Sequence, residues 1–149
     1  MKSCGKKLCE EYMGKHPVIS ISLKGINAAS YEAAFELTVK TIKGAVEKAG
    51  FLKMSDKLDE DEKKEYRAIL DENMSEATLF WSLKNLSELL EKHYETKVIL
   101  LIDEYDVPLA KAFENGYYDK MVFLIRNLLE QTLKTNNSLK FAVMTGCMR

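Results

Sequence analysis

The sequence predicts an α/β fold in which helices flank a parallel β-sheet. Three short apolar segments rich in β-branched residues, at positions 17–23, 98–102 and 140–145, have the pattern of strands. Segments with helical periodicity separate them, and this alternation favours parallel strands joined by right-handed crossovers. The chain has 149 residues, 46% of them hydrophobic and 30% charged, which is typical of one globular domain with its own core.

The first two elements are a strand at residues 17–23 (PVISISL) and an amphipathic helix after it. Gly25 and Asn27 interrupt the strand pattern, and Ser30 is a suitable helix N-cap. Apolar residues then recur at steps of four and three, which places them on one helix face, and Gly50 would end the helix. This predicted stripe consists of Phe35, Val39, Ile42, Val46 and Ala49.

Residues 53–73 form the most charged segment of the chain. Asp59 and Glu62 have the spacing of a capping box, which predicts a helix to about residue 72. Its apolar face is thin, so we interpret the segment as a solvent-covered insertion and not as a site. Its apolar residues are Tyr66, Ile69 and Leu70.

A longer helix is predicted to open at Ser75, and Trp81 lies off its apolar stripe, where a packing role is expected. That stripe consists of Leu79, Leu83, Leu86, Leu90 and Tyr94. The next strand, VILLI at 98–102, is uninterrupted in its apolar character, which is typical of a strand covered on both faces. Pro108 can begin a short helix that Gly116 ends, and residues 118–133 form a further strong helix before the last strand.

Composition excludes several classes of protein. The 22 basic and 23 acidic side chains give a net charge of −1, so no basic excess indicates a nucleic-acid or anionic-membrane partner. No apolar run approaches the roughly 18 residues of a membrane span, and the N-terminus lacks the apolar core of a signal peptide. Cys4, Cys9 and Cys147 form no CxxC pair, which argues against a disulfide framework or a zinc site. A cytoplasmic location is the simplest interpretation.

Asp103 and Glu104 follow the 98–102 strand directly. Ligands of parallel α/β sheets bind beyond the carboxyl ends of the strands, and Mg²⁺ needs only one or two carboxylates because it retains several waters. Apolar residues followed by Asp-Glu are typical of the Walker B motif, in which the Asp orients magnesium and the Glu polarises the attacking water. The same pattern also fits acids that only end a strand or cap a turn, as Asp106 could do ahead of Pro108.

Three segments, EEYMGKHPVISISLKG, VILLIDEYDVPL and KFAVMTGCMR, resemble the bacterial AAA-ATPase-like family, in which an ATPase-type domain often precedes a PD-(D/E)XK nuclease-like domain. The resemblance covers nearly the whole chain, and the similar segments occur in the same order as in the family. It implies a three-layer, P-loop-NTPase-like parallel sheet in which residues 17–23 are the second strand, 97–102 the Walker B strand and 140–145 the next.

The resemblance also implies Mg²⁺ and ATP as ligands of the parent domain. Asp103 would serve the metal, Glu104 would be the catalytic base, and Thr145 would occupy the position of a polar sensor of the γ-phosphate. An exposed hydroxyl at a strand end, without that role, fits Thr145 equally well. No role follows for Arg149.

A phosphate-binding loop of the form GxxxxGK[ST] does not occur in these 149 residues. The nearest matches fail because Gly5-Lys6-Lys7 is followed by no Ser or Thr, and Gly14-Lys15-His16 has Cys9 in the place of the upstream glycine. We therefore expect residues 1–149 to be a partial AAA-ATPase-like domain with three core strands, inactive alone and with at most weak affinity for ATP. The position of the family's first strand, beside residues 140–145, would be unoccupied, and this unpaired sheet edge could support self-association.

Two other classes of function remain open on the sequence. One is a non-catalytic α/β interaction module, in which the Asp-Glu pair merely ends a strand. The other is a metal-dependent phosphotransfer or nuclease-type site built from Asp103, Glu104 and Asp106, although no Lys or catalytic His accompanies these acids at matching strand ends. A nucleotide is the expected partner, and neither a membrane nor a nucleic acid is indicated.

Overall fold

The computed structural model describes residues 15–146 and has the predicted α/β architecture. Three parallel strands form one sheet in the order β1-β2-β3, with β2 in the centre. The strands span Val18–Ser22 (β1), Val98–Asp103 (β2) and Leu139–Met144 (β3). The predicted α/β class and the neighbouring positions of the three strands are therefore confirmed.

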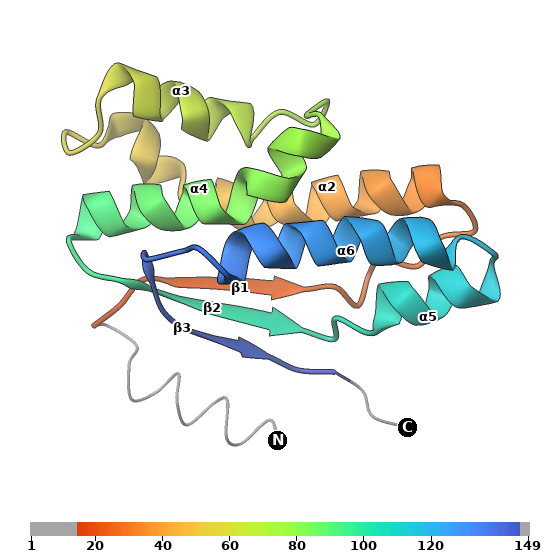
Figure 1. Cartoon of the computed structure of the whole chain (residues 1–149). Helices are drawn as coiled ribbons and strands as arrows, with labels where there is room; N and C mark the ends of the chain where they lie inside the picture. The colour runs from red at the N-terminus through yellow and green to blue at the C-terminus, as the bar shows by residue number, and fades with distance from the viewer. Residues whose placement is uncertain (1–14, 147–149) are drawn as a thin grey trace.

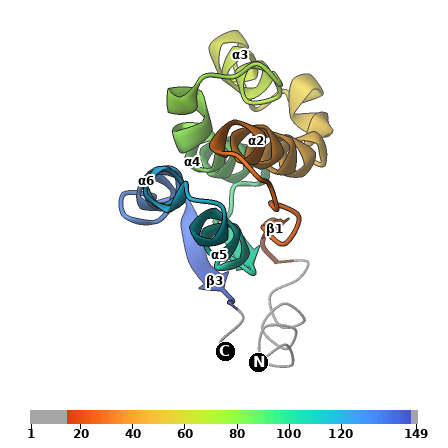
Figure 2. The ribbon, with the colours of Figure 1, turned by 90° about the vertical axis from the view of Figure 1, so that its right-hand side faces the viewer.

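Helices cover the sheet, and Figures 1 and 2 show three of them lying side by side over the strands. These three are α2 (Tyr31–Glu47), α4 (Glu76–Tyr94) and α6 (Tyr118–Leu133). The short helix α5 (Val107–Glu114) lies beyond the carboxyl end of β2. A further layer above α2 and α4 consists of the 3₁₀ turn η1 (Gly50–Met54) and α3 (Glu60–Ala68).

The core lies between the sheet and the first helical layer. In the strand register, Ile19 is opposite Leu100 and Ile21 is opposite Ile102, and all four side chains belong to the buried cluster. The neighbouring Ile99, which alternation places on the other face of β2, is only 1% exposed. Burial of successive residues on both faces explains why the sequence of β2 is uninterrupted in its apolar character.

The predicted helix starts are confirmed because the capping residues act as expected. Ser30 accepts a hydrogen bond from the backbone N–H of Ala33 at 3.3 Å, and Ser75 accepts one from Thr78 at 3.1 Å. Asp59 and Glu62 form the complete capping box of α3. The predicted bounds of the last helix, 118–133, agree with α6.

In the charged segment, residues 53–73, the helix is shorter than the sequence predicts and the apolar side chains are more deeply buried. Helix α3 ends at Ala68 instead of near residue 72, and Tyr66 and Ile69 are 0% and 1% exposed. The hydroxyl of Tyr66 donates a 2.7 Å hydrogen bond to the carbonyl of Val46 in α2. Burial raises the pKa of Tyr66 to about 12. The thin apolar face therefore anchors this segment to the helical layer, while its charges remain outside.

The end of α2 differs from the prediction. Gly50 does not end α2, which stops at Glu47, but begins the 3₁₀ turn η1. None of the helices in residues 15–146 has the length and apolar character needed to cross a membrane. The cysteines, the Gly5-Lys6-Lys7 stretch and Arg149 lie outside the described residues, as does Gly14.

Candidate functional site

The candidate site lies where β2 ends and the chain turns into α5. Asp103 is the last residue of β2, its side chain is exposed, and its register partner on β1 is Ser22. Glu104 follows in the turn and is half-buried. The sequence places these acids here because five apolar residues fill the buried part of β2, so the first charged residue falls at the sheet edge, where it remains hydrated.

Thr145 holds the end of β3 against this turn through three hydrogen bonds. Its backbone N–H donates to the carbonyl of Ile102 at 2.9 Å, and its carbonyl accepts from the N–H of Tyr105 at 3.2 Å. Its hydroxyl donates to Oδ1 of Asp103. The structure therefore brings together Asp103 and Thr145, two residues separated by 42 positions, and the carboxylate is oriented from β3.

Glu104 has an unusual backbone conformation. Its φ angle is 54°, in the left-handed region that residues with a side chain seldom adopt. The chain needs this conformation to leave the strand at Asp103 and form the turn in which Val107 N–H donates to the Glu104 carbonyl at 3.3 Å. Strained backbone of this kind is concentrated at functional sites. The Glu104 carboxylate makes no hydrogen bond or ion pair to any residue between 15 and 146.

The geometry around Asp103 suits a hydrated magnesium ion. Oδ1 accepts the bond from Thr145, while Oδ2 accepts no hydrogen bond from residues 15–146, and Asp103 as a whole is exposed. A single oriented carboxylate is sufficient for Mg²⁺ when phosphate oxygens and waters complete an octahedron. Within residues 15–146, no three or more His, Cys, Asp or Glu side chains form a group that could hold a metal ion.

Asp106 does not cap helix α5 with its side chain. It occupies the N-cap position of α5, but its side chain makes no capping hydrogen bond to the helix. Its backbone is helical, with φ −78° and ψ −22°, whereas capping residues are normally extended. Pro108 in the first turn also removes one of the N–H groups that a cap would bind.

Two residues of the site were missed by sequence reasoning. Ser22 ends β1 beside Asp103, and its hydroxyl accepts a 3.3 Å hydrogen bond from the N–H of Lys24. Gly146 lies close against the turn, because a Cβ at this position would be 3.0 Å from the Tyr105 ring and 3.3 Å from Oδ1 of Asp106. The signal for Ser22 was its place at the end of a predicted strand; nothing in the sequence indicated the contact at Gly146.

The candidate site lies at the carboxyl edge of the sheet, where β2 ends. The cavity beside β1, of about 220 Å³, and the open hollow of about 730 Å³ between the starts of α2 and α6 are lined by other residues. Asp103, Glu104 and Thr145 line neither of these two cavities.

Comparison with known proteins identifies the family of the chain. A family model described as predicted AAA-ATPase, the AAA-ATPase-like family, matches residues 5–149. No curated protein and no solved structure matches the chain. Because the family match covers nearly the full length, this chain belongs to the AAA-ATPase-like family of predicted AAA-ATPases.

Proposed function

We propose that this chain carries the Walker B half of an ATP-hydrolysing site, with Asp103 directed to magnesium, Glu104 to the attacking water and Thr145 to the γ-phosphate. The observation that carries the proposal is the hydrogen bond from the Thr145 hydroxyl to Asp103, which joins the ends of two adjacent parallel strands. Family membership supports a nucleotide ligand. Bound Mg²⁺ would supply charge stabilisation at the phosphates.

Asp103 would bind the ion or one of its waters through Oδ2, because Oδ1 is already held by Thr145. This bond fixes the carboxylate before a ligand arrives, so less side-chain freedom is lost on binding. Thr145 can also redirect its hydroxyl proton, since a hydroxyl both donates and accepts hydrogen bonds. A contact between this hydroxyl and the γ-phosphate would be coupled to the orientation of Asp103.

Glu104 would accept a proton from the attacking water. Its carboxylate has no protein partner in residues 15–146, so no existing bond must break before it can act. General-base assistance of this kind typically contributes about 10²–10⁴ in rate. The left-handed backbone at Glu104 would aim its side chain in a direction different from that of Asp103, which leaves the two carboxylates free for separate tasks.

The remaining phosphate contacts would come from a loop outside these 149 residues, because the sequence contains no GxxxxGK[ST]. We propose that residues 1–149 are part of a larger ATPase domain. The isolated chain should then bind ATP with a dissociation constant weaker than micromolar, measured by isothermal titration calorimetry with Mg²⁺ present. Micromolar or tighter binding by this chain alone would contradict this part of the proposal.

The catalytic assignment is tested in a protein that contains both this sequence and the loop. Glu104→Gln should retain ATP binding and lower kcat about 10²-fold or more. Glu95→Gln is the matched control, because Glu95 also has a positive φ, 57°, but caps α4 just before the amino end of β2, at the opposite end of this strand from Glu104. If Glu104→Gln hydrolyses ATP as the unmodified protein does, Glu104 is not the base and the Asp-Glu pair only ends a strand.

A further inference from the structure

The outer edge of β1 has no partner strand among residues 15–146. The N–H of Ile99 donates to the carbonyl of Pro17 at 2.9 Å, so in this parallel ladder the odd-numbered residues of β1 direct their backbone groups toward β2. The N–H and C=O groups of Val18, Ser20 and Ser22 therefore point away from the sheet. These groups can form hydrogen bonds with an added strand.

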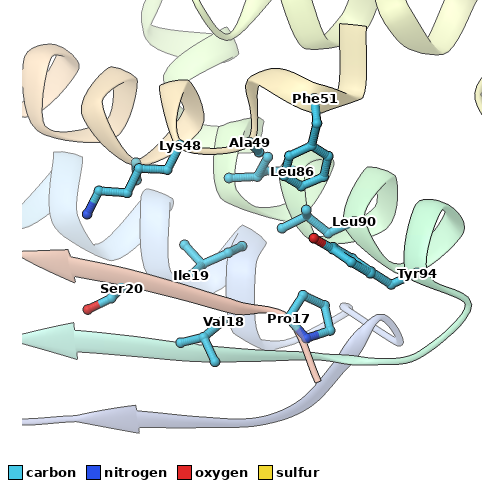
Figure 3. Close-up of a pocket in the computed structure, with 11 residues that line it drawn as sticks. Pro17, Val18, Ile19, Ser20, Lys48, Ala49, Phe51, Leu86, Leu90 and Tyr94 are labelled. Atoms are coloured by element: carbon cyan, nitrogen blue, oxygen red, sulfur yellow. The ribbon is translucent and has the colours of Figure 1, made fainter. Parts of the chain in front are cut away.

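An apolar cavity of about 220 Å³ lies beside this edge, between β1, the end of α2, η1 and α4 (Figure 3). Its volume is large enough for one leucine or phenylalanine side chain. Phe51 and Tyr94 lie at one end, with ring centroids 5.7 Å apart, and they are 40% and 49% exposed. Two large aromatic side chains that are partly exposed beside the unpaired edge of a strand are typical of an interaction surface.

The other end of the cavity carries a positive charge. Lys48 extends from the end of α2 toward the β1 side of the cavity, is exposed, and forms no ion pair within residues 15–146. Strand β1 itself contains no acidic residue, and Lys15 and Lys24 flank it. The charge of the surface therefore complements an acidic ligand and would oppose the same surface on a second copy of the chain.

We propose that the β1 edge binds an extended acidic segment of a partner protein, which adds a strand to β1. One large apolar side chain of the partner would occupy the cavity, and an Asp or Glu would lie against Lys48. Main-chain hydrogen bonds would provide general affinity, and the cavity and the lysine would provide specificity. The cavity is lined by residues 17–20 of this edge, whereas Asp103 is opposite Ser22 at the other end of β1, so the inference does not depend on the proposed ATPase chemistry.

The test is selection from a phage-displayed library of random heptapeptides on the full 149-residue chain. Enriched peptides should combine a large apolar residue with Asp or Glu at a fixed spacing. Each is then synthesised with a fluorescein label and titrated by fluorescence anisotropy. Lys48→Glu should weaken binding at least tenfold, whereas Lys64→Glu on α3, the same charge change at another exposed lysine, should leave it unchanged.

Ser20→Pro tests the strand addition itself, because it removes an outward N–H and none of the bonds between β1 and β2. It should also weaken binding at least tenfold. Circular dichroism identifies variants that fail to fold. If Ser20→Pro fails to fold, the proposal is tested by Lys48→Glu, which changes only an exposed side chain.

Three results would overturn the proposal. The first is no enrichment above that on an unrelated protein, and the second is enriched peptides that bind Lys48→Glu as tightly as the unmodified chain. The third is a dimer in sedimentation velocity that Ser20→Pro dissociates, because a second copy would then occupy the edge.

Discussion

Replacing Glu104 by glycine should make the protein more stable. Glu104 has φ 54°, where a residue with a Cβ is disfavoured by about 1–2 kcal/mol and glycine is not. Glycine is more flexible in the unfolded chain, which opposes this gain by about 0.5–1 kcal/mol. The Glu104 carboxylate has no hydrogen bond or ion pair to residues 15–146 that the substitution would remove.

The expected net gain is therefore about 0–1.5 kcal/mol in the free energy of unfolding, with the middle of the range at about 0.8 kcal/mol. For a chain of this size the middle of the range corresponds to a rise of roughly 2–3 °C in Tm. A gain from removing a proposed catalytic residue is the expected sign of a backbone held in a strained conformation for function.

The assay is urea and thermal unfolding followed by far-UV circular dichroism, with two comparison variants. Glu95→Gly should also be stabilising, because Glu95 ends α4 with φ 57° and the ion pair with Lys57 that it loses is exposed and contributes little. Glu88→Gly, at an exposed position inside α4, should cost about 1 kcal/mol. If Glu95→Gly gains stability while Glu104→Gly loses 1 kcal/mol or more, the reasoning about strain at the site is wrong.

Three further predictions concern the packing around the site and the charged segment. Tyr66→Phe should lower the free energy of unfolding by about 0.5–1.5 kcal/mol, measured by urea denaturation, because it removes a buried hydrogen bond to α2. Hydrogen bonding from the backbone of α3 lowers the pKa of Asp59 in the folded protein. Ionised Asp59 therefore contributes to the free energy of unfolding above its unfolded pKa of about 3.9, and this contribution is lost as the pH falls through the lower folded pKa. Asp59→Asn, which still caps, should remove this part of the pH dependence in urea titrations between pH 2 and pH 5, and unchanged pH dependence would contradict the assignment. Gly146→Ala should destabilise by about 1 kcal/mol in the same assay because its Cβ meets the Tyr105 ring at 3.0 Å, whereas Gly25→Ala, with open space around it, should not show that clash.

The sequence was sufficient for features that depend on neighbouring residues. Ser30, Ser75 and Asp59 mark helix starts because a capping side chain bonds to N–H groups two or three positions away. The bounds of α6 follow from its periodicity, and the uninterrupted VILLI segment follows from burial on both faces. The placement of Asp103 at a strand end also follows, because the apolar run stops there.

The remaining features depend on contacts between distant residues. A thin apolar face of three residues gave no sign that Tyr66 would be fully buried, because its burial depends on packing of α3 against α2. Helix α2 ends before Gly50, since a glycine permits a helix end without requiring one. Asp106 has a helical backbone and does not cap α5 with its side chain, which its place ahead of Pro108 in the sequence did not indicate.

The sequence by itself determined the class of fold, the order of its elements and the position of an acidic pair after the central strand. Only the tertiary structure decided that Thr145 orients Asp103, that Glu104 has a left-handed backbone and that β1 presents an open edge beside an apolar cavity. The physical reason is the distance along the chain over which the determining interactions act. Periodicity and capping act over a few residues, whereas strand register and the meeting of strand ends depend on how the whole chain packs.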